Sequence, residues 1–390
     1  MPGRKREPAG RPIRVLTVIE SLEAGGAQRH VLSLAKCLGR SGFRLAVATS
    51  GDEPLGHEFR GAGIPVYTLV RESTRERLSP LFAARLSRLA VRGDFDIIHG
   101  HLHTTRIAAA VAARVSGLPL VLTHHSMDDH RPTWHRALGR WADRQADAVI
   151  AVATNLADYV ARSGVTARVI RNGVDIPDRL WSDADRLAAR ARLGVPGGAY
   201  LISYVGRFFG EKNPLLFVEM AARVSAHCPN AHFLMIGDGP LRAEAEARSH
   251  ALDIADRMTF AGFRSDAAEL HQAVDVLTLT SDTEGTPLVV LEAMAVSRPV
   301  VATAVGDVPA QVADGTTGFV VAPCDAAALA SAVLRLADAS LRQRLGQAGR
   351  ERVRREFTVE RCLSATAAVY REAVERRGPG CLDGDDRAAA

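Results

Sequence analysis

Short apolar runs alternate with amphipathic segments of helical period along nearly the whole chain. In the first half, runs at 13–19, 45–49, 66–69, 97–99, 120–123 and 148–153 are each followed by a helix-like stretch. After a segment at 176–198 that we interpret as a linker, the pattern restarts at 201–205, 232–236, 258–260, 276–280, 299–302 and 318–321. Such alternation is typical of βαβ units with buried parallel strands. It predicts an α/β protein with two doubly wound domains, in which ligands bind beyond the carboxyl ends of the strands.

Composition excludes several other classes of protein. The chain has 390 residues, of which 47% are hydrophobic and 24% charged, close to the average for globular proteins. No apolar run approaches the roughly 18 residues that a membrane-spanning helix needs. Residues 1–10 lack the apolar stretch of a secretory signal, and we expect 1–10 and 378–390 to be disordered tails. Five scattered cysteines without metal-like or redox spacing indicate a reducing compartment, so we expect a cytoplasmic protein.

Charge is distributed unevenly between the two halves. Residues 1–178 contain 25 Lys and Arg against 17 Asp and Glu, whereas the remaining 212 residues contain 24 against 27. A basic half is typical of proteins that meet nucleic acid, an anionic membrane or a phosphorylated substrate. Aromatic residues make up 5% of the chain and no nucleic-acid-binding motif is present, so we expect no nucleic-acid partner.

The stretch 281–295 carries the strongest local signal for chemistry. A strand ends near Thr280, and Gly285 followed by Pro287 at a first helical position indicates the start of a helix. The amides that would face outward there belong to Gly285, Thr286, Leu288 and Val289. Amides at the positive end of a helix suit an anion such as a pyrophosphate. Glu284 and Glu292 flank this turn, and the second carboxylate could accept hydrogen bonds from sugar or ribose hydroxyls; alternatively, Glu284 caps the helix and Glu292 is a solvated surface residue.

Two further strand-to-helix turns carry candidate ligand contacts. In 203–214, Asn213 is a plausible N-cap and Pro214 a first helical residue, which places Arg207 and Lys212 after the strand. An arginine fork and a lysine point charge suit a diphosphate, although both could be solvated loop charges. Gly237 opens the third turn, where glycine allows the backbone to approach a ligand closely.

In the amino-terminal half, Gly25 and Gly26 follow the first strand and open a helix. The stretch is not GxGxxG, so the dinucleotide-binding fingerprint is absent. The two glycines still supply a flexible loop for a phosphate or an acceptor. His124 and His125 end a later strand, and a histidine there is a candidate partner for a reacting centre.

Taken together, these motifs resemble glycosyltransferase family 4, the retaining GT-B transferases, over roughly residues 13–375. The matching motifs are Gly25–Arg29, Arg171–Asp175, Gly206-Arg207 with Glu211-Lys212, Gly237–Pro240, Ala261–Phe263 and Glu284 with Glu292. The resemblance implies GT-B architecture, with two Rossmann-like domains facing an interdomain cleft. Residues 11–174 would form the acceptor-side domain, residues 175–356 the nucleotide-sugar-binding domain, and a crossover helix at 357–377 would pack back on the first.

The resemblance also implies roles for individual residues. Arg207 and Lys212 would hold the diphosphate and stabilise its departure, Glu292 would grip the ribose hydroxyls, and Glu284 would contact the donor sugar. His125 would face the anomeric carbon. The remaining donor-binding positions are Gly25, Gly26, Gly237, Phe263 at the base, and the Gly285, Thr286, Leu288 and Val289 backbone. The chain departs from the pattern at Arg171, Asp307 and Ala310, where the family often has Pro, Gly and Glu.

The activity implied is retaining transfer of a hexose or N-acetylhexosamine from a nucleotide-diphosphate sugar to a glycan, glycolipid or lipid-linked acceptor. A UDP-sugar is the favoured donor and GDP-mannose the second. We expect no metal or other cofactor, and a front-face path in which the leaving diphosphate helps to take the acceptor proton. Polysaccharide biosynthesis is the pathway that the family's frequency favours.

Three alternatives remain at this point. The first is a nucleotide-sugar 2-epimerase, an enzyme that has the same two-domain fold. The second is a non-enzymatic binding protein, in which the donor-side residues would have no use. A metal-dependent hydrolase could use His99, His101 and His103, joined by His124, His125 and Asp128. The pairs Asp94/Asp96 and Asp183/Asp185 also match the DxD pattern of metal-binding transferases.

Two basic segments indicate where a lipid-linked acceptor could lie. Arg75–Arg92 reads as an amphipathic helix with a leucine-rich face, and Arg131–Arg144 adds Trp134 and Trp141 among four arginines. This mixture suits the inner face of an anionic membrane, with the protein bound peripherally. The alternative is an ordinary core-facing helix with a solvated basic face.

Overall fold

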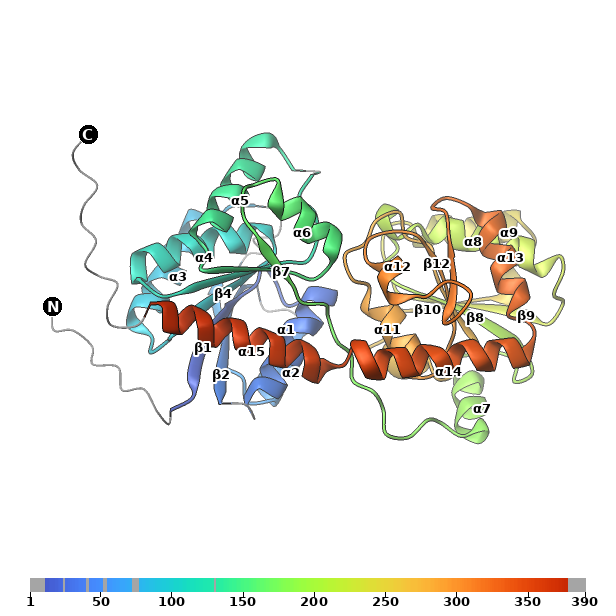
Figure 1. The fold of residues 1–390 in the computed structure, drawn as a ribbon. Coiled ribbons are helices and arrows are strands. Elements are labelled where there is room, and N and C mark those ends of the chain that lie inside the picture. Colours follow the sequence, from blue (N-terminus) through green and yellow to red (C-terminus); the bar gives the residue numbers. More distant parts are fainter. Residues whose placement is uncertain are drawn as a thin grey trace, which may run out of the picture. The chain divides into compact units, whose positions relative to one another are not determined.

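The computed structural model describes residues 11–23, 25–39, 42–51, 55–71, 77–129 and 131–377. The expected tails at 1–10 and 378–390 lie outside the described residues, as does Arg75. The described chain folds into two compact units (Figure 1). The first comprises residues within 1–171 together with those from 362 onward, and the second comprises residues 172–361.

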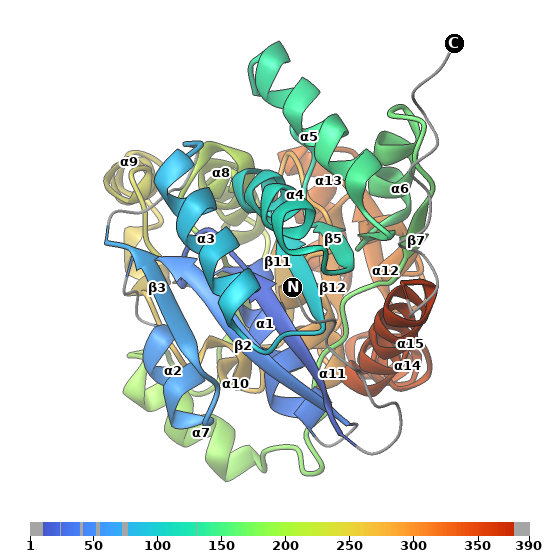
Figure 2. The same cartoon turned by 90° about the vertical axis from the view of Figure 1, so that its left-hand side faces the viewer.

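The first unit is built on a parallel sheet of seven strands in the order β3-β2-β1-β4-β5-β6-β7; Figure 2 labels β3, β2, β5 and β7 of this sheet. Its strands are β1 (Ile13–Val18), β2 (Phe43–Ser50), β3 (Val66–Val70), β4 (Ile97–His101), β5 (Leu120–His124), β6 (Ala148–Ala151) and β7 (Ala167–Val169). Its helices are α1 (Gly26–Leu38), α2 (Leu55–Gly61), α3 (Pro80–Arg92), α4 (His103–Ser116), α5 (Thr133–Gln145), α6 (Thr154–Ala161) and most of α15 (Val359–Arg376).

The second unit has a parallel sheet of six strands in the order β10-β9-β8-β11-β12-β13. Its strands are β8 (Tyr200–Val205), β9 (Ala231–Ile236), β10 (Met258–Gly262), β11 (Val276–Leu279), β12 (Val300–Thr303) and β13 (Gly318–Val321). Its helices are α7 (Asp183–Arg192), α8 (Pro214–Ser225), α9 (Arg242–Ala251), α10 (Ala267–Leu270), α11 (Leu288–Ala295), α12 (Val308–Gln311), α13 (Ala326–Arg335) and α14 (Ala339–Glu356), with short 3-10 turns at Gly210–Lys212 and Ala255–Arg257.

Burial on both faces explains why the central strands read as continuous apolar runs. All six residues of β9 are buried, and β11 and β12 are buried throughout. In each sheet the strand order reverses once, between β1 and β4 in the first and between β8 and β11 in the second. Such a switch point leaves a crevice at the carboxyl ends of the two strands, where doubly wound folds bind ligands.

The segment 176–198, expected as a linker, contains the helix α7. Ser182 and Asp185 form a capping box at its start, since each side chain bonds the other residue's backbone amide. Further along the helix, Arg186 and Arg190 each lie 2.9 Å from the Asp275 carboxylate. Arg190 also donates to the carbonyls of Ala273, Gly197 and Ala199. The expectation of a plain linker was therefore wrong, because capping and these ion pairs fold the segment onto the sheet.

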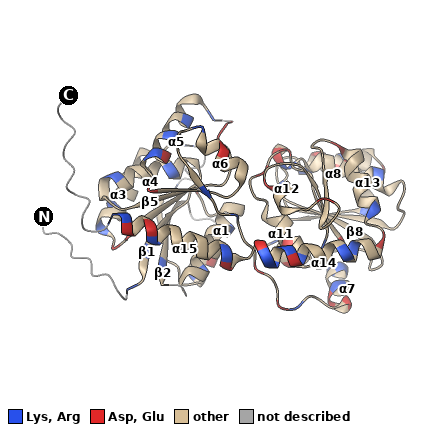
Figure 3. Cartoon of the chain, viewed as in Figure 1, with Lys and Arg blue, Asp and Glu red and all other residues tan. Residues whose placement is uncertain are grey.

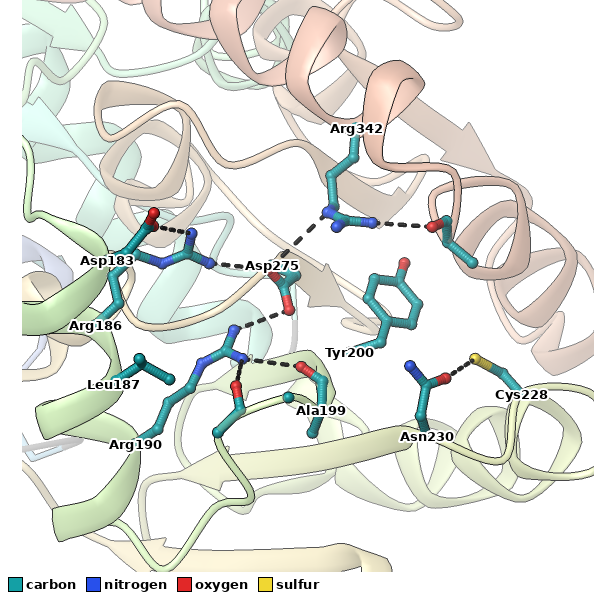
Figure 4. A pocket seen from close by; sticks show the side chains of 13 residues that line it. Asp183, Arg186, Leu187, Arg190, Ala199, Tyr200, Cys228, Asn230, Asp275 and Arg342 are labelled. Atoms are coloured by element: carbon teal, nitrogen blue, oxygen red, sulfur yellow. Dashed lines mark hydrogen bonds and ion pairs between the residues drawn. The ribbon is translucent and has the colours of Figure 1, made fainter.

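We call the ion pairs of Arg186 and Arg190 with Asp275 the Asp275 clamp. A cavity of about 410 Å³ lies beside it (Figure 4). It is lined by Arg186, Arg190, Arg342, Asp275 and Tyr200, among others. Tyr200 begins β8 and Asp275 directly precedes β11, so the cavity is at the amino ends of the strands. The predicted donor residues follow the carboxyl ends of the same strands. The arginines of the cavity thus anchor α7 and α14 at the amino ends of the strands, opposite the predicted donor residues.

The helix α15 packs on the sheet of the first unit. The Tyr370 hydroxyl lies 2.6 Å from His99 Nδ1 on β4, and the Tyr370 ring packs against Phe43. Glu372 pairs with Arg168 on β7. In the second unit, the Val174 amide donates to the Phe357 carbonyl over 3.0 Å, beside the point where α15 begins.

The two basic segments are helical, with later starts than the sequence indicated. The first is α3, which begins at Pro80 behind its N-cap Ser79 rather than at Arg75. Phe82 and Leu86 are buried, but Leu81 is 54% exposed and does not join the apolar face. The second is α5, on which Trp134 is 59% exposed. Figure 3 shows basic residues along both helices. Within the described part of the chain, no helix is both long and apolar enough to cross a membrane.

Candidate active site

The loop after β8 carries Arg207 and Lys212, as the sequence predicted. Tyr204 donates its hydroxyl to the Arg207 carbonyl over 2.8 Å, which fixes the turn. The Arg207 guanidinium lies 2.9 Å from Glu211 and 4.9 Å from the centre of the Phe209 ring. Its side chain is 42% exposed, so it can still turn toward a ligand.

Lys212 and Glu284 form the closest contact between the loops at the switch point. The Lys212 ammonium lies 2.6 and 2.7 Å from the two Glu284 carboxylate oxygens, and the Ser281 hydroxyl donates to the same carboxylate over 2.7 Å. The Thr280 hydroxyl donates to the carbonyls of Lys212 and Asn213, which ties the end of β11 to the β8 loop. Because β8 and β11 are neighbours, two motifs some 70 residues apart meet in one ionic cluster.

The helix α11 follows this cluster. Pro287 is its N-cap and Leu288 its first residue, one position later than predicted. The first turn contains no acidic residue, and Pro287 provides no side-chain cap, so neither competes for the amides of this turn. The Asp307 amide donates to the Gly285 carbonyl over 2.9 Å, so this departure from the family pattern still supports the loop through its backbone. The residues Gly285, Thr286, Leu288 and Val289 are thus grouped around the helix start.

Gly237 shapes the third loop. Its φ is +136°, and a Cβ placed there would lie 1.9 Å from the Gly206 carbonyl oxygen. The Gly206 amide in turn donates to the Ile236 carbonyl, at the end of β9. The β8 and β9 loops therefore touch through their backbones, an approach that only glycine allows.

Glu292 and Phe263, the predicted ribose and base contacts, come from α11 and from the residue after β10. Glu292 is on α11, and one carboxylate oxygen is 3.6 Å from Nε2 of His271, a fully buried histidine just after α10. Neither His271 ring nitrogen has a hydrogen-bond partner among the described residues. Sequence analysis missed His271, because a lone histidine 21 positions before Glu292 carries no pattern. Phe263 follows β10 and is 59% exposed.

In the first unit, the glycine loop and His125 lie near one another. Gly25 is the N-cap of α1 and Gly26 its first residue. His30, on the same helix, packs against the His125 ring at 5.4 Å between centroids. His125 directly follows β5, next to β4 in the sheet. The geometry thus brings together the predicted residues of this unit.

His125 belongs to a cluster of four imidazoles with His30, His99 and His101. His101 Nδ1 lies 2.9 Å from His125 Nε2, and the rings of His99 and His101 are 4.0 Å apart. Burial lowers the pKa of His30 to about 4 and, together with His30 nearby, that of His99 to about 3. Burial, reinforced by the neighbouring histidines, also places the pKa of His101 and His125 well below the ordinary value. All four rings are therefore neutral at pH 7.

His124 belongs to a different network on the opposite side of the strand. Arg106, a fully buried arginine, contacts His124, Asp143 at 2.8 Å and Asp128 at 2.6 Å. Burial alone would raise the pKa of Asp128, but the Arg106 guanidinium and then His103 hold it well below its ordinary range. This network ties α4, which carries Arg106, to α5, which carries Asp143.

The histidines of the hydrolase alternative divide between these two networks: His99, His101 and His125 lie in the imidazole cluster, and His103 and His124 lie around Arg106 and its carboxylates. His99 is bonded through both nitrogens, to Tyr370 and to Thr123. His103 is the first residue of α4 and lies 2.9 Å from Asp128. Among the residues that the structure describes, no group of three or more His, Cys, Asp and Glu could hold a metal ion.

The two DxD pairs have structural partners. Asp94 and Asp96 pair with Arg11 and Arg14 before β4. Asp183 and Asp185 belong to the start of α7.

Comparisons with known proteins agree with this architecture. The family described as Glycosyltransferase Family 4 matches residues 24–177, and the one described as Glycosyl transferases group 1 matches residues 185–352. The D-inositol 3-phosphate glycosyltransferase of Geodermatophilus obscurus is 31% identical over 395 residues, covering 90% of this chain and 86% of that protein. The alpha-D-kanosaminyltransferase of Streptomyces kanamyceticus is 29% identical over 296 residues, covering 70% of this chain and 77% of that protein.

Solved structures share the fold. Anabaena HepE in complex with UDP-glucose superposes with a TM-score of 0.83 at 23% identity, over 92% of this chain and all of that one. Sucrose-phosphate synthase from Thermosynechococcus elongatus gives 0.76 at 26% identity, over 94% of this chain and all of that one. The chain belongs to the family 4 glycosyltransferases and has their GT-B fold. It is a transferase, and its similarity to named transferases does not favour the epimerase alternative.

Proposed function

We propose that this protein transfers a hexose or N-acetylhexosamine, with retention, from a nucleotide-diphosphate sugar to a glycan, glycolipid or lipid-linked acceptor. The observation that carries the proposal is the Lys212–Glu284 pair at the switch point between β8 and β11, with Arg207 in the same loop as Lys212. This cluster combines cations for a diphosphate with a carboxylate for a sugar hydroxyl, next to the amides at the start of α11.

A UDP-sugar is the donor we favour, with GDP-mannose second. HepE, which shares the fold, is described in complex with UDP-glucose. In our proposal Arg207, Lys212 and the first amides of α11 bind the diphosphate, Glu292 accepts hydrogen bonds from the ribose hydroxyls, and Phe263 borders the base. Glu284 binds a hydroxyl of the sugar, and Gly25, Gly26 and Gly237 let backbone approach the ligand.

The chemistry follows from where charge develops. As the glycosidic bond to the diphosphate breaks, negative charge grows on the departing phosphate oxygens, where Arg207 and Lys212 stabilise it without a metal. The acceptor hydroxyl attacks from the same face and passes its proton to the departing diphosphate. His125 faces the sugar and does not form a covalent bond to it.

Thermal denaturation with nucleotides tests the donor site. UDP, GDP and ADP are added separately, with and without EDTA, to the wild type and to Glu292→Ala, Arg207→Ala and the exposed control Glu219→Ala. A ligand at about 100 times its Kd adds roughly 2.7 kcal/mol of stability. We expect one nucleotide to stabilise the wild type and the control equally, with EDTA present, and to stabilise neither site variant. Stabilisation that requires a metal, or none with any nucleotide, contradicts the proposal.

The acceptor side includes the basic helices of the first unit. We propose peripheral binding to the anionic inner face of the membrane through α3 and α5, where exposed Trp134 stands among Arg131, Arg136 and Arg140. Flotation with anionic and neutral vesicles at low salt tests it. Binding to anionic but not to neutral vesicles supports the proposal, provided that Trp134→Ala weakens it and Arg355→Gln on α14 does not. Failure to bind either type of vesicle contradicts the proposal.

A further inference from the structure

The bond between His101 and His125 constrains the tautomer of both rings. One ring nitrogen of each histidine faces the other, His101 Nδ1 and His125 Nε2, over 2.9 Å. Both rings are neutral, because burial keeps their pKa values well below the ordinary range. A neutral imidazole has one N–H donor and one lone-pair acceptor. A single proton is therefore shared between these nitrogens, and it belongs either to His101 or to His125.

The other nitrogen of His101 decides between these two arrangements. His101 Nε2 is buried and has no hydrogen-bond partner among the described residues. If His125 donated to His101, then His101 would carry its own proton on Nε2, as a buried donor without an acceptor. If His101 donates from Nδ1, its Nε2 is only an unused acceptor. Orphaned buried donors are rarer than under-used acceptors, so the second arrangement is favoured.

His101 is also unable to rotate away from this bond. It is fully buried on β4, and its ring packs 4.0 Å from that of His99. His99 is fixed at both nitrogens, by Tyr370 at 2.6 Å and by Thr123 at 2.7 Å. Directly after His101, Leu102 has a φ of +62°, a conformation uncommon for a residue with a side chain, at the turn into α4. Packing on His99 and this turn hold the His101 ring toward His125.

We infer that His101 is a positioning residue, which donates from Nδ1 to His125 Nε2 and so holds His125 in the tautomer protonated at Nδ1. His125 then offers an N–H donor at Nδ1, while its other nitrogen is occupied. In this state His125 can donate a hydrogen bond from Nδ1 to a hydroxyl or carbonyl-type oxygen of the sugar. It cannot act as a general base, because its lone pair on Nε2 already accepts the bond from His101. The inference rests on the proposed function for the role of His125 toward the donor sugar, and the tautomer itself rests on the geometry alone.

Nuclear magnetic resonance of ¹⁵N-histidine-labelled protein tests the tautomer without any ligand. Ring signals are assigned with the variants His101→Asn, His101→Leu and His125→Gln. We expect His125 in the wild type to be protonated at Nδ1 and unprotonated at Nε2. His101→Asn, whose amide can place a donor near the position of Nδ1, should keep that state, and His101→Leu should lose it. A wild-type His125 protonated at Nε2, or a state unchanged in His101→Leu, overturns the inference.

Transfer assays with the same variants test the consequence. We expect His101→Leu to lose about tenfold in kcat/KM, the worth of one hydrogen bond, and His101→Asn to stay close to the wild type. Nucleotide binding without sugar should be unchanged in both, which separates this effect from damage to the fold. A His101→Leu variant that folds and transfers at the wild-type rate overturns the positioning role. Failure of the wild type to bind any nucleotide would instead count against the proposed function and leave the tautomer measurement valid.

Discussion

Lys212 Nζ lies within 2.7 Å of both carboxylate oxygens of Glu284, although the two residues come from different loops. The Glu284 side chain is 7% exposed and that of Lys212 is 23% exposed, so the pair is largely shielded from water. One group of the pair is proposed to bind the sugar and the other the diphosphate. In the proposed function, their contact would bring the sugar and the diphosphate of the donor together at the bond that breaks.

Neutralising either member of the pair should remove activity, but the two substitutions should differ in their effect on stability. Lys212→Met leaves a shielded carboxylate whose one remaining side-chain partner among the described residues is Ser281, which should destabilise the fold by about 1–3 kcal/mol. Glu284→Gln keeps the shape and should fold nearly as well. Each should lower kcat/KM by about 100-fold or more, because each removes a group that we propose to act at the reacting centre. Thermal denaturation and transfer assays measure the two effects.

The double variant Lys212→Met/Glu284→Gln separates folding from chemistry. Without a charge to leave unpaired, it should recover stability relative to Lys212→Met, yet stay inactive. Removing the exposed Arg248–Glu219 pair is the matched control, and should change stability by less than about 1 kcal/mol. Wild-type activity in Glu284→Gln would contradict a role for this carboxylate.

Gly237→Ala should disrupt the donor loops through its backbone. A Cβ there would lie 1.9 Å from the Gly206 carbonyl oxygen, and the backbone φ of +136° is one that residues with a side chain rarely adopt. We expect the variant to lose nucleotide-dependent stabilisation in a thermal shift assay and to unfold at a lower temperature. Gly210→Ala, in the neighbouring β8 loop, is the control, because a Cβ at Gly210 has no atom within 4 Å and should leave binding intact. Equal nucleotide binding in both variants would contradict this account.

The sequence predicted the strands well because parallel buried strands are continuous apolar runs. The twelve runs coincide with β1–β6 and β8–β13. The missing strand, β7, has three residues that are half-buried or exposed at the sheet edge, so it lacks an apolar run. The helix α7 was missed although Ser182 and Asp185 fit the spacing of a capping box. Its many Asp, Ala and Arg residues suggested a linker, and only the contacts to Asp275 explain why it folds onto the sheet.

The candidate site was predictable as a set of loops but not as a set of contacts. Motifs that follow β8, β9 and β11 come together because of strand order, which the βαβ pattern implies. The pairing of Lys212 with Glu284 depends on side-chain conformation, which no spacing encodes. The alternating histidines 99, 101 and 103 suggested a metal site, whereas the structure places His99 and His101 in a neutral imidazole cluster and His103 beside Asp128 in the Arg106 network.

Removing the charge of Asp275 should destabilise the second unit. The carboxylate binds Arg186 and Arg190 and accepts the Leu201 amide, and Arg190 is buried (Figure 4). Asp275→Asn leaves the buried Arg190 without its carboxylate and Arg186 with only the exposed Asp183 among the described residues, and breaking a buried pair of this kind costs about 3–5 kcal/mol. We expect the melting temperature to fall by about 10 °C. Asp183→Asn is the control, since that side chain is 97% exposed, and an equal Tm for both variants would contradict the clamp.

Acid should destabilise the first unit through its imidazole cluster. Burial lowers the pKa of His30 to about 4 and that of His99 to about 3, whereas unfolded histidine titrates near 6.5. Between pH 6.5 and 4 the unfolded chain therefore binds protons that the folded chain does not, and stability falls as the pH falls, by about 2 kcal/mol per histidine at pH 5. Melting temperatures at pH 7.5, 6 and 5 measure this slope. His30→Phe should reduce it by the share of one histidine, the exposed His57→Gln should not, and identical slopes for all three proteins would contradict the burial of a neutral His30.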